Sequence, residues 1–303
     1  YTDGVTVWNA NHQVMFNGTG LLGSWSSTQS AIIVPRPNHP DIYYIFTIPA
    51  GWFNGGNLRY SEVDMTLQGG LGAVTSNKNI LLSAAKKKKK LTSVANGNGT
   101  GIWVLCPTNL GVMRAFEVTA AGVNTTPVTS AMGANPWVIG QLKASPDGQW
   151  LAWGGSTGWN SSPPRLASFN NVTGLITGSV ALPIGGNYVY GVEFSKTSNF
   201  LYLVTTVNLM GGLLQQFDLL AGSLTAIAAS SVNIGNTSVG HHRSMQLAPD
   251  HKIYLVGQWT NFLDVVNFPD SAGAACGLQL NAVSLATGTQ GIWGLPNFIQ
   301  SFF

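Results

Sequence analysis

One hairpin pattern recurs along the chain at intervals of about fifty residues, a length typical of propeller repeats. Each copy has an apolar strand, a tight turn of Pro, Asp, Asn, Gly or Ser, and a second apolar strand, which is the pattern of a β-hairpin. The turns are centred on Asp41, Asn98, Asp147, Thr197 and Asp250. Asp147 and Asp250 are expected to cap their own turns. This repeat predicts the blades of a β-propeller.

Further strands follow each hairpin. Third strands are expected at residues 58–65, 113–118, 165–169, 214–219 and 262–267, and weaker fourth strands at, for example, 176–182 and 225–233. No segment has convincing helical periodicity, so the chain is predicted to be all-β. A β-sandwich and a β-helix are the alternatives. Sandwich strands do not repeat one hairpin at this spacing, however, and β-helix rungs are much shorter.

The 303 residues are predicted to form a single β-propeller domain with four-stranded blades. Five full blades are expected, together with part of a first blade and a ring-closing strand. Their ranges are 1–27 for the partial blade, 28–90, 91–138, 139–186, 187–239 and 240–290 for the full blades, and 291–303 for the closing strand. Because an open ring exposes two strand edges, we expect residues upstream of Tyr1 to complete it. The chain is then a fragment of a longer protein.

Charged residues make up only 8% of the chain, where about 25% is usual. Five of the fourteen Lys and Arg residues form one run, Lys86, Lys87, Lys88, Lys89 and Lys90, which leaves nine basic residues against eleven acidic ones. Nucleic-acid-binding proteins spread their basic residues over a face, so no nucleic-acid partner is predicted. The lysine run is predicted to be a solvated loop.

Neither a membrane span nor a zinc site is predicted. No apolar run reaches the roughly 18 residues that a spanning helix needs. Cys106 and Cys276 are the only two cysteines, and they fit no zinc pattern. They could form one disulfide, and the sequence leaves that pairing open.

Few residues are available for catalysis or metal binding. The chain has 11 acidic residues and 5 His. His241 and His242 are adjacent, and neighbours in an extended segment point to opposite sides, which argues against a shared metal ion. Glu62, Glu117 and Glu193 form no recognisable glycosidase pair. We therefore predict no catalytic residue, no metal site and no cofactor.

Tryptophan is the best indicator of binding in this sequence. The chain has ten, and six lie in or beside loops rich in Gly, Ser and Asn: Trp25, Trp52, Trp137, Trp153, Trp159 and Trp259. Aromatic residues in polar loops suit flat sugar rings or protein hot spots. The alternative is that these side chains pack between blades, as Trp103 and Trp150 are expected to do from within strands.

Motifs along nearly the whole chain are shared with one family. They are YTDGVTVWN at 1–9, SAIIVP at 30–35, LRYSEVDM at 58–65, LAPD at 247–250 and GLPNFIQSFF at 294–303. In this combination the chain resembles the N-terminal β-propeller of large surface proteins from gliding and related Bacteroidota. Those proteins end in a gliding-motility-associated, type IX secretion sorting domain. The resemblance implies export to the cell surface or medium, and a ring of seven blades, five full and two partial in this chain. It implies no characterised catalytic residue.

Three positions bear on this resemblance. The lysine run and His251, which stands where a turn glycine is expected, depart from the family pattern. The tripeptide Asp270-Ser271-Ala272 is similar to the O-glycosylation motif of the same phylum. The resemblance therefore makes Ser271 a candidate glycosylation site.

The function predicted from the sequence is a non-enzymatic binding or adhesion module of a secreted surface protein. Its loop aromatics would contact glycan or protein at the propeller rim, and it would contact other domains or copies of the same protein. The first alternative is a purely structural block of a surface filament or giant adhesin. The second is a polysaccharide-active enzyme, which requires two carboxylates, or a His and a carboxylate, to converge at the mouth of the central channel.

Overall fold

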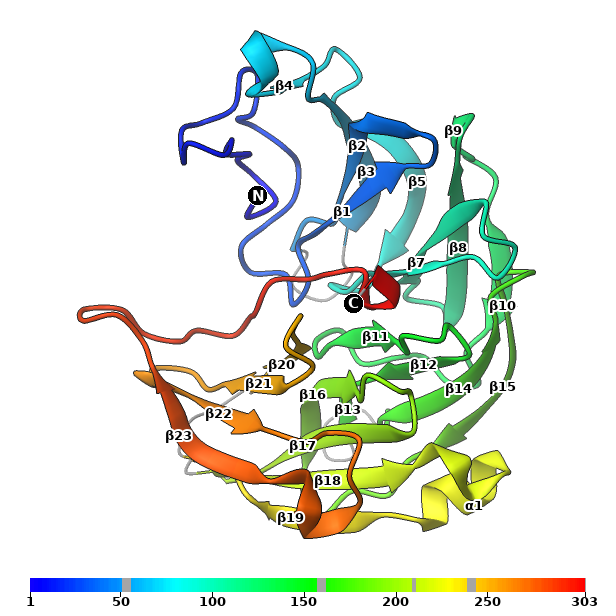
Figure 1. Ribbon diagram of the computed structural model, residues 1–303. Helices are drawn as coiled ribbons and strands as arrows, with labels where there is room; N and C mark the ends of the chain where they lie inside the picture. Colours follow the sequence, from blue (N-terminus) through cyan, green and yellow to red (C-terminus); the bar gives the residue numbers. More distant parts are fainter. Residues whose placement is uncertain (51–55, 157–161, 209–210, 239–243, 303) are drawn as a thin grey trace.

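The computed structural model describes residues 1–50, 56–156, 162–208, 211–238 and 244–302. Its strands form five antiparallel sheets that follow one another along the chain (Figure 1). In this part of the chain, helix is confined to α1 (Leu224–Ala229) and to four short 3-10 turns. The prediction of an all-β chain is confirmed.

We call the five sheets blades 1 to 5. Blade 1 contains β1 (Ala31–Arg36), β2 (His39–Thr47), β3 (Gly56–Asp64), β4 (Ala73–Val74) and β5 (Ile80–Lys87). Blade 2 contains β6 (Thr92–Ala95), β7 (Gly101–Pro107), β8 (Val112–Thr119), β9 (Gly122–Val123) and β10 (Val128–Ala131). Blade 3 contains β11 (Leu142–Ala144), β12 (Trp150–Trp153), β14 (Arg165–Asn170) and β15 (Leu175–Ala181).

The other two blades follow the same plan. Blade 4 contains β13 (Gly155–Ser156), β16 (Tyr188–Phe194), β17 (Phe200–Asn208), β18 (Gly211–Asp218) and β19 (Val232–Asn236). Blade 5 contains β20 (Ser244–Leu247), β21 (Ile253–Val256), β22 (Phe262–Val266) and β23 (Leu278–Ser284). The long strands of each blade pair in sequence as a meander, and the short strands β4, β9 and β13 are additions to it: β4 and β5 both pair with β3, β9 and β10 both pair with β8, and β13 pairs with β16.

The innermost strands of the blades, β1, β6, β11, β16 and β20, surround one axis. Each contacts the next in this order. In Figure 1 the blades form an arc from blue through green to orange, and its open side lies between the N-terminal segment and β22–β23. This is how blades are arranged in a propeller. The ring of seven blades stays a prediction.

The apolar core lies between successive blades rather than within one of them. Phe46 of blade 1 and Phe116 of blade 2 share one buried cluster, and Tyr202 of blade 4 and Leu255 of blade 5 share another. Burying a large apolar side chain stabilises the fold by about 1.5–3 kcal/mol. Blade-to-blade contact is therefore the main source of stability, and it fixes how the innermost strands meet.

The hairpin turns have the chemistry that the sequence indicates. The Asp147 carboxylate accepts a hydrogen bond from the Gln149 N–H at 3.0 Å, and the Asp250 carboxylate accepts one from the Lys252 N–H at 3.2 Å. Both carboxylates cap their own turns, as predicted. His251 has a φ of 64°, so it takes the left-handed backbone conformation for which a glycine was expected.

Of two predicted strands, the one at 225–233 is displaced, since β19 starts only at Val232, and the one at the C-terminus is absent from the described residues. Residues 225–233 begin as helix α1, because the Ser223 hydroxyl caps it by accepting the Ala226 N–H at 3.1 Å. A helix of six residues is too short to show a periodic pattern. Residues 291–302 form no strand and end in a 3-10 turn, Gln300–Phe302, that packs beside β6 near the axis. Their polar side chains bind the innermost strands instead of pairing with a sheet edge.

The two cysteines and three lysines of the run are buried. Cys106 and Cys276 form no disulfide, and they are buried in different clusters. The prediction that the lysine run is a solvated loop is wrong for Lys88, Lys89 and Lys90, which are 7%, 8% and 0% exposed. These three residues connect β5 to β6, the innermost strand of blade 2, and that connection lies inside the ring of blades.

A buried polar cluster ties the innermost strands together around the axis. Lys143 on β11 and Glu193 on β16 form an ion pair at 3.0 Å, with side chains 1% and 0% exposed. The Lys143 ammonium also donates to the Gln246 carbonyl on β20 at 2.6 Å. Glu193 accepts from the Leu247 N–H at 2.9 Å and from the Gln300 amide. We call Gln141, Lys143, Glu193, Gln246 and Gln300 the axial cluster.

Removing one partner of the Lys143–Glu193 pair should destabilise the fold strongly. The remaining charge would stay buried without its counter-charge, which costs about 3–5 kcal/mol. We expect Glu193→Gln and Lys143→Met each to lower the free energy of unfolding by this amount, as measured by urea denaturation. Lys143→Met combined with Glu193→Gln should cost clearly less than the two single losses added together. Strict additivity would contradict the coupling of the two charges.

Candidate functional site

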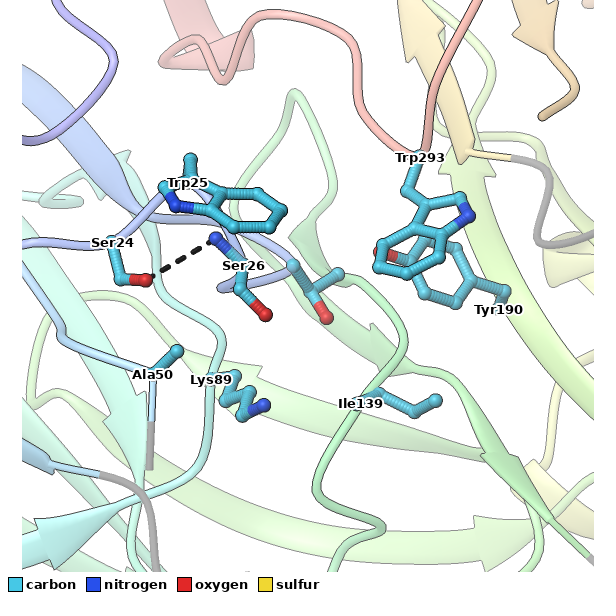
Figure 2. Close-up of a pocket in the computed structure, with 9 residues that line it drawn as sticks. Ser24, Trp25, Ser26, Ala50, Lys89, Ile139, Tyr190 and Trp293 are labelled. Atoms are coloured by element: carbon cyan, nitrogen blue, oxygen red, sulfur yellow. Dashed lines mark hydrogen bonds between the residues drawn. The ribbon is translucent and has the colours of Figure 1, made fainter. Parts of the chain in front are cut away.

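A pocket of about 470 Å³ lies at one end of the axis (Figure 2). Thr28, Lys89 and Ile139 lie in its wall just before the innermost strands β1, β6 and β11, and Tyr190 lies within β16. The innermost strands of blades 1 to 4 therefore start at this pocket. The other lining residues are Ser24, Trp25, Ser26, Ala50 and Trp293. We call it the axial pocket.

Two indoles give this pocket flat apolar walls. Trp25 and Trp293 lie on opposite sides of the space in Figure 2, with Ser26 below Trp25 and with Lys89 and Ile139 on the lower side. The Trp25 side chain is 81% exposed and that of Trp293 is 37% exposed, so both present part of their ring surface to solvent. Indole faces stack well on flat or ring-shaped ligands. A sugar ring matches this geometry.

Backbone hydrogen bonds fix the position of Trp25 although its side chain is exposed. The Ser24 N–H donates to the Ser30 hydroxyl at 3.0 Å, and the Ser27 N–H donates to the Ser24 carbonyl at 2.9 Å. The Gly23 N–H bonds to the Gly4 carbonyl at 2.9 Å. A side chain at Gly4, where φ is +92°, would strike the Ser30 hydroxyl. The turn that carries Trp25 is therefore held in one conformation.

Backbone hydrogen bonds also fix the position of Lys89, on the lower side of the pocket. Its N–H donates to the Val138 carbonyl at 3.3 Å, and its carbonyl accepts from the Gln29 N–H at 3.1 Å. The Gln29 amide in turn exchanges two hydrogen bonds with the backbone of Leu142, at 2.9 and 2.8 Å. Burial lowers the pKa of Lys89 below its ordinary value. The reason is that the uncharged amine loses less hydration free energy on leaving water than the charged ammonium does.

Two further titratable groups lie against this site. Burial, aided by the charge of Lys88, lowers the pKa of Lys90 to about 7, and its Nζ donates to the Ile139 carbonyl at 2.9 Å. Burial raises the pKa of Tyr190 to about 12, although a hydrogen bond with Thr28 opposes the shift. At neutral pH the phenol of Tyr190 is thus a neutral hydrogen-bonding group.

The lining offers a base and hydroxyl donors but no acid. Of the lining residues that the structure describes, none is Asp or Glu. The Ser24 hydroxyl accepts from the Ser26 N–H at 3.2 Å, which leaves its own O–H able to donate to a ligand. Such a site can stack a sugar ring, polarise a carbonyl and accept a proton at Lys89.

The six tryptophans predicted to bind ligand have different positions. Trp25 lines the axial pocket, and Trp259 lines a second pocket on blade 5. Trp137 stacks at a tilt on Tyr188, with ring centroids 5.5 Å apart. Trp153, the last residue of β12, is 1% exposed, so it packs in the core, as the alternative to ligand binding expects. Trp52 and Trp159 lie outside the described residues.

The remaining predicted positions add no catalytic group. His241 and His242 lie outside the described residues, and within the described ones no cluster of three His, Cys, Asp or Glu could hold a metal ion. Ser271 is half-buried, and its carbonyl accepts from the Gln216 amide at 2.8 Å; its glycosylation stays a prediction. No helix in the described ranges is long and apolar enough to cross a membrane.

Sequence reasoning missed three residues of the site, Lys89, Tyr190 and Trp293. From the sequence, Lys89 is predicted to lie in a solvated charge run, and neither Tyr190 nor Trp293 is singled out. The signal that could have found the first two is their place in the repeat, since residues at or just before the first strand of each repeat line the axis end. Trp293 carries no such signal, because the C-terminal segment forms no strand.

Comparisons with known proteins identify the fold and no family. No protein-family model and no curated protein sequence matches the chain. The structure of the periplasmic gluconolactonase of Pseudomonas aeruginosa matches 96% of this chain and 82% of that one, at 14% identity and a TM-score of 0.52. The chain therefore shares the β-propeller fold of that protein.

Two other solved structures are similar at lower scores. A protein named as a 6-phosphogluconolactonase from Bacteroides uniformis matches 82% of this chain and 84% of that one, at 12% identity and a TM-score of 0.46. TolB from Acinetobacter baumannii matches 78% of this chain and 52% of that one, at 12% identity and a TM-score of 0.44.

The prediction of a non-enzymatic adhesion module is corrected by these findings. The fold that covers nearly the whole chain is one used by an enzyme, the gluconolactonase. Of the tryptophans predicted to form a binding rim, Trp153 is buried in the core instead. The alternative of a carbohydrate-active enzyme has the better support.

Lys90 should make the stability of the fold rise with pH. Its pKa is about 7 in the folded state and returns toward 10.5 on unfolding, so the unfolded chain binds more protons between these pH values. The contribution of Lys90 to the free energy of unfolding is therefore lowest below pH 7, and it increases with pH up to about pH 10.5. We expect the free energy of unfolding, measured by urea denaturation, to increase less between pH 7 and pH 10 in Lys90→Met than in the wild type.

A matched control for this measurement is Lys252→Met, in the turn between β20 and β21. It should leave the pH dependence of the free energy of unfolding as in the wild type. Equal pH dependence in the wild type and Lys90→Met would contradict the buried position of the Lys90 amine.

Proposed function

We propose that this chain is an enzyme that hydrolyses a sugar lactone in the axial pocket. One observation carries the proposal: Lys89, with a pKa lowered by burial, lines a pocket that has two indole walls and no carboxylate among its described residues. The name of the gluconolactonase with which it shares the fold supports the same substrate class. Cleavage of a glycosidic bond needs a pair of carboxylates, and this pocket lacks them.

The residues divide the chemistry of lactone opening among themselves. The sugar ring stacks on Trp25 and Trp293. As water adds to the lactone carbonyl carbon, the uncharged Lys89 amine takes one of its protons. The carbonyl oxygen gains negative charge and receives hydrogen bonds from the hydroxyls of Ser24 and Thr28. The bond from the carbonyl carbon to the ring oxygen then breaks, the ring oxygen takes the proton from Lys89, and an aldonic acid leaves.

The cellular setting belongs to the same proposal. The periplasmic location in the name of the gluconolactonase agrees with export of this chain out of the cytoplasm. Display on the cell surface of a Bacteroidota species, and completion of a seven-bladed ring, rest on the family resemblance alone. Both are part of this proposal.

Substitutions in the pocket should separate binding from chemistry. With glucono-δ-lactone as substrate, Lys89→Met should lower kcat by roughly 100-fold or more, because general-base catalysis contributes at least that much. Trp25→Ala should instead raise KM by roughly 10-fold, because it removes one stacking wall. Both are read from the proton release that accompanies hydrolysis, on variants shown by circular dichroism to be folded.

Lys252→Met serves as the lysine control, since it lies away from the pocket and should keep wild-type kinetics. The proposal fails if the wild type opens no lactone in a panel of glucose, galactose, mannose and xylose derivatives. It fails equally if Lys89→Met retains full kcat.

The activity should also depend on the protonation of Lys89. The amine works as a base only when it has lost its proton, so kcat/KM should increase with pH. Because burial lowers the pKa of Lys89, the midpoint of this increase should lie below 10.5. The rate is corrected for the spontaneous hydrolysis of the lactone at each pH. A profile that falls with increasing pH would show that Lys89 is not the base.

A further inference from the structure

A second pocket, which we call the rim pocket, lies on blade 5 beside the C-terminal segment. Its volume is about 440 Å³, and it is lined by Trp259, Asn261, Gly288, Thr289, Gln290 and Ile292. None of these six residues is charged. Pockets of this size hold small molecules and single sugar units.

Trp259 presents its indole to solvent from a rigid turn. The side chain is 69% exposed, and the backbone has a φ of 59°, a left-handed conformation that is rare for a bulky residue. The Trp259 N–H donates to the Gly291 carbonyl at 2.8 Å, and the Gly291 N–H donates to the Thr260 carbonyl at 2.7 Å. A Cβ at Gly291 would lie 2.5 Å from Val256, so this close approach requires glycine. The surrounding contacts thus maintain an otherwise unfavourable conformation that exposes an apolar ring.

The groups beside the indole are suited to hydroxyls. Within the described part of the chain, the side-chain amides of Asn261 and Gln290 make no hydrogen bond to protein groups, and both residues are exposed. Each amide can donate and accept at once. An indole face flanked by two uncharged amides is the chemistry that recognises a neutral sugar ring. A charged ligand would find no counter-charge in this lining.

The rim pocket lies at the same end of the axis as the axial pocket. Val256, the last residue of β21, pairs with Ser244, the first residue of the innermost strand β20. The turn that carries Trp259 follows β21, so it lies where the innermost strands begin. Ile292 lines the rim pocket and Trp293 lines the axial pocket. These two residues are consecutive, with Cα atoms about 3.8 Å apart, so one chain segment separates the two pockets.

We infer that the rim pocket is a second subsite for a neutral sugar ring, and that the substrate is an oligosaccharide ending in an aldonolactone. The identity of the substrate rests on the proposed lactone hydrolysis in the axial pocket, and the subsite itself does not. In such a substrate the lactone is the former reducing end, and the other rings are attached through hydroxyls away from its carbonyl. The terminal lactone occupies the axial pocket while an earlier ring stacks on Trp259.

Turnover as a function of chain length tests the substrate class. The substrates are aldonolactones of one to four sugar units from glucan, mannan and xylan oligosaccharides. For one linkage series, kcat/KM of the wild type should increase at least 10-fold with chain length. Trp259→Ala should lose this gain and keep wild-type turnover of the single-unit lactone, and Trp259→Phe should keep the gain. Absence of a chain-length gain in all three series would overturn the inference.

Binding without turnover tests the subsite by itself. The probes are methyl glycosides of the same tetrasaccharides, which contain no lactone, titrated by isothermal calorimetry. Wild type should bind one series saturably, and Trp259→Ala and Asn261→Ala should each weaken it at least 5-fold, with melting temperatures checked for both. Binding with no hydrolysis of any lactone would retain the subsite and reject the proposed function. Failure of all three tetrasaccharides to bind, or binding unaffected by both variants, would overturn the subsite.

Discussion

The ion pair of Lys143 and Glu193 is the constraint on which the arrangement of the blades depends. A lysine and a glutamate shielded from water are stable only as partners, and these two come from the innermost strands of blades 3 and 4. Gln246 of blade 5 and Gln300 of the C-terminal segment complete their hydrogen bonds. One polar cluster thus fixes three blades and the chain end around the axis. The starts of the innermost strands, where the axial pocket forms, follow from that register.

The axial pocket combines a rigid frame with unusual electrostatics. Charged residues are rare in this chain, and three lysines of the run, Lys88 to Lys90, are buried in addition to the paired Lys143. Burial favours the uncharged form of a lysine and lowers the pKa of Lys89. The proposed role of Lys89 as proton acceptor depends on this shift, because the chain has few His and carboxylate residues to take that role. Lys89 is thereby part of the site rather than of a solvated loop.

Part of this account could be predicted from the sequence. The spacing of Asp147, Thr197 and Asp250 indicates the repeated hairpins, because turn chemistry is local. Trp25 could be proposed as a binding residue from its polar loop. Trp153 was misassigned because its neighbouring glycines look like a loop, although its side chain packs between blades 2 and 3. Lys89 and Tyr190 escaped because only the assembled ring shows which ends of distant strands meet.

The most direct test of the central claim is a crystal structure of this chain soaked with gluconate, the open product of the proposed reaction. The account predicts a sugar chain between Trp25 and Trp293, with its carboxylate within hydrogen-bonding distance of the Lys89 amine and the Ser24 hydroxyl. A carboxylate bound away from Lys89, or an empty axial pocket at saturating gluconate, would contradict it.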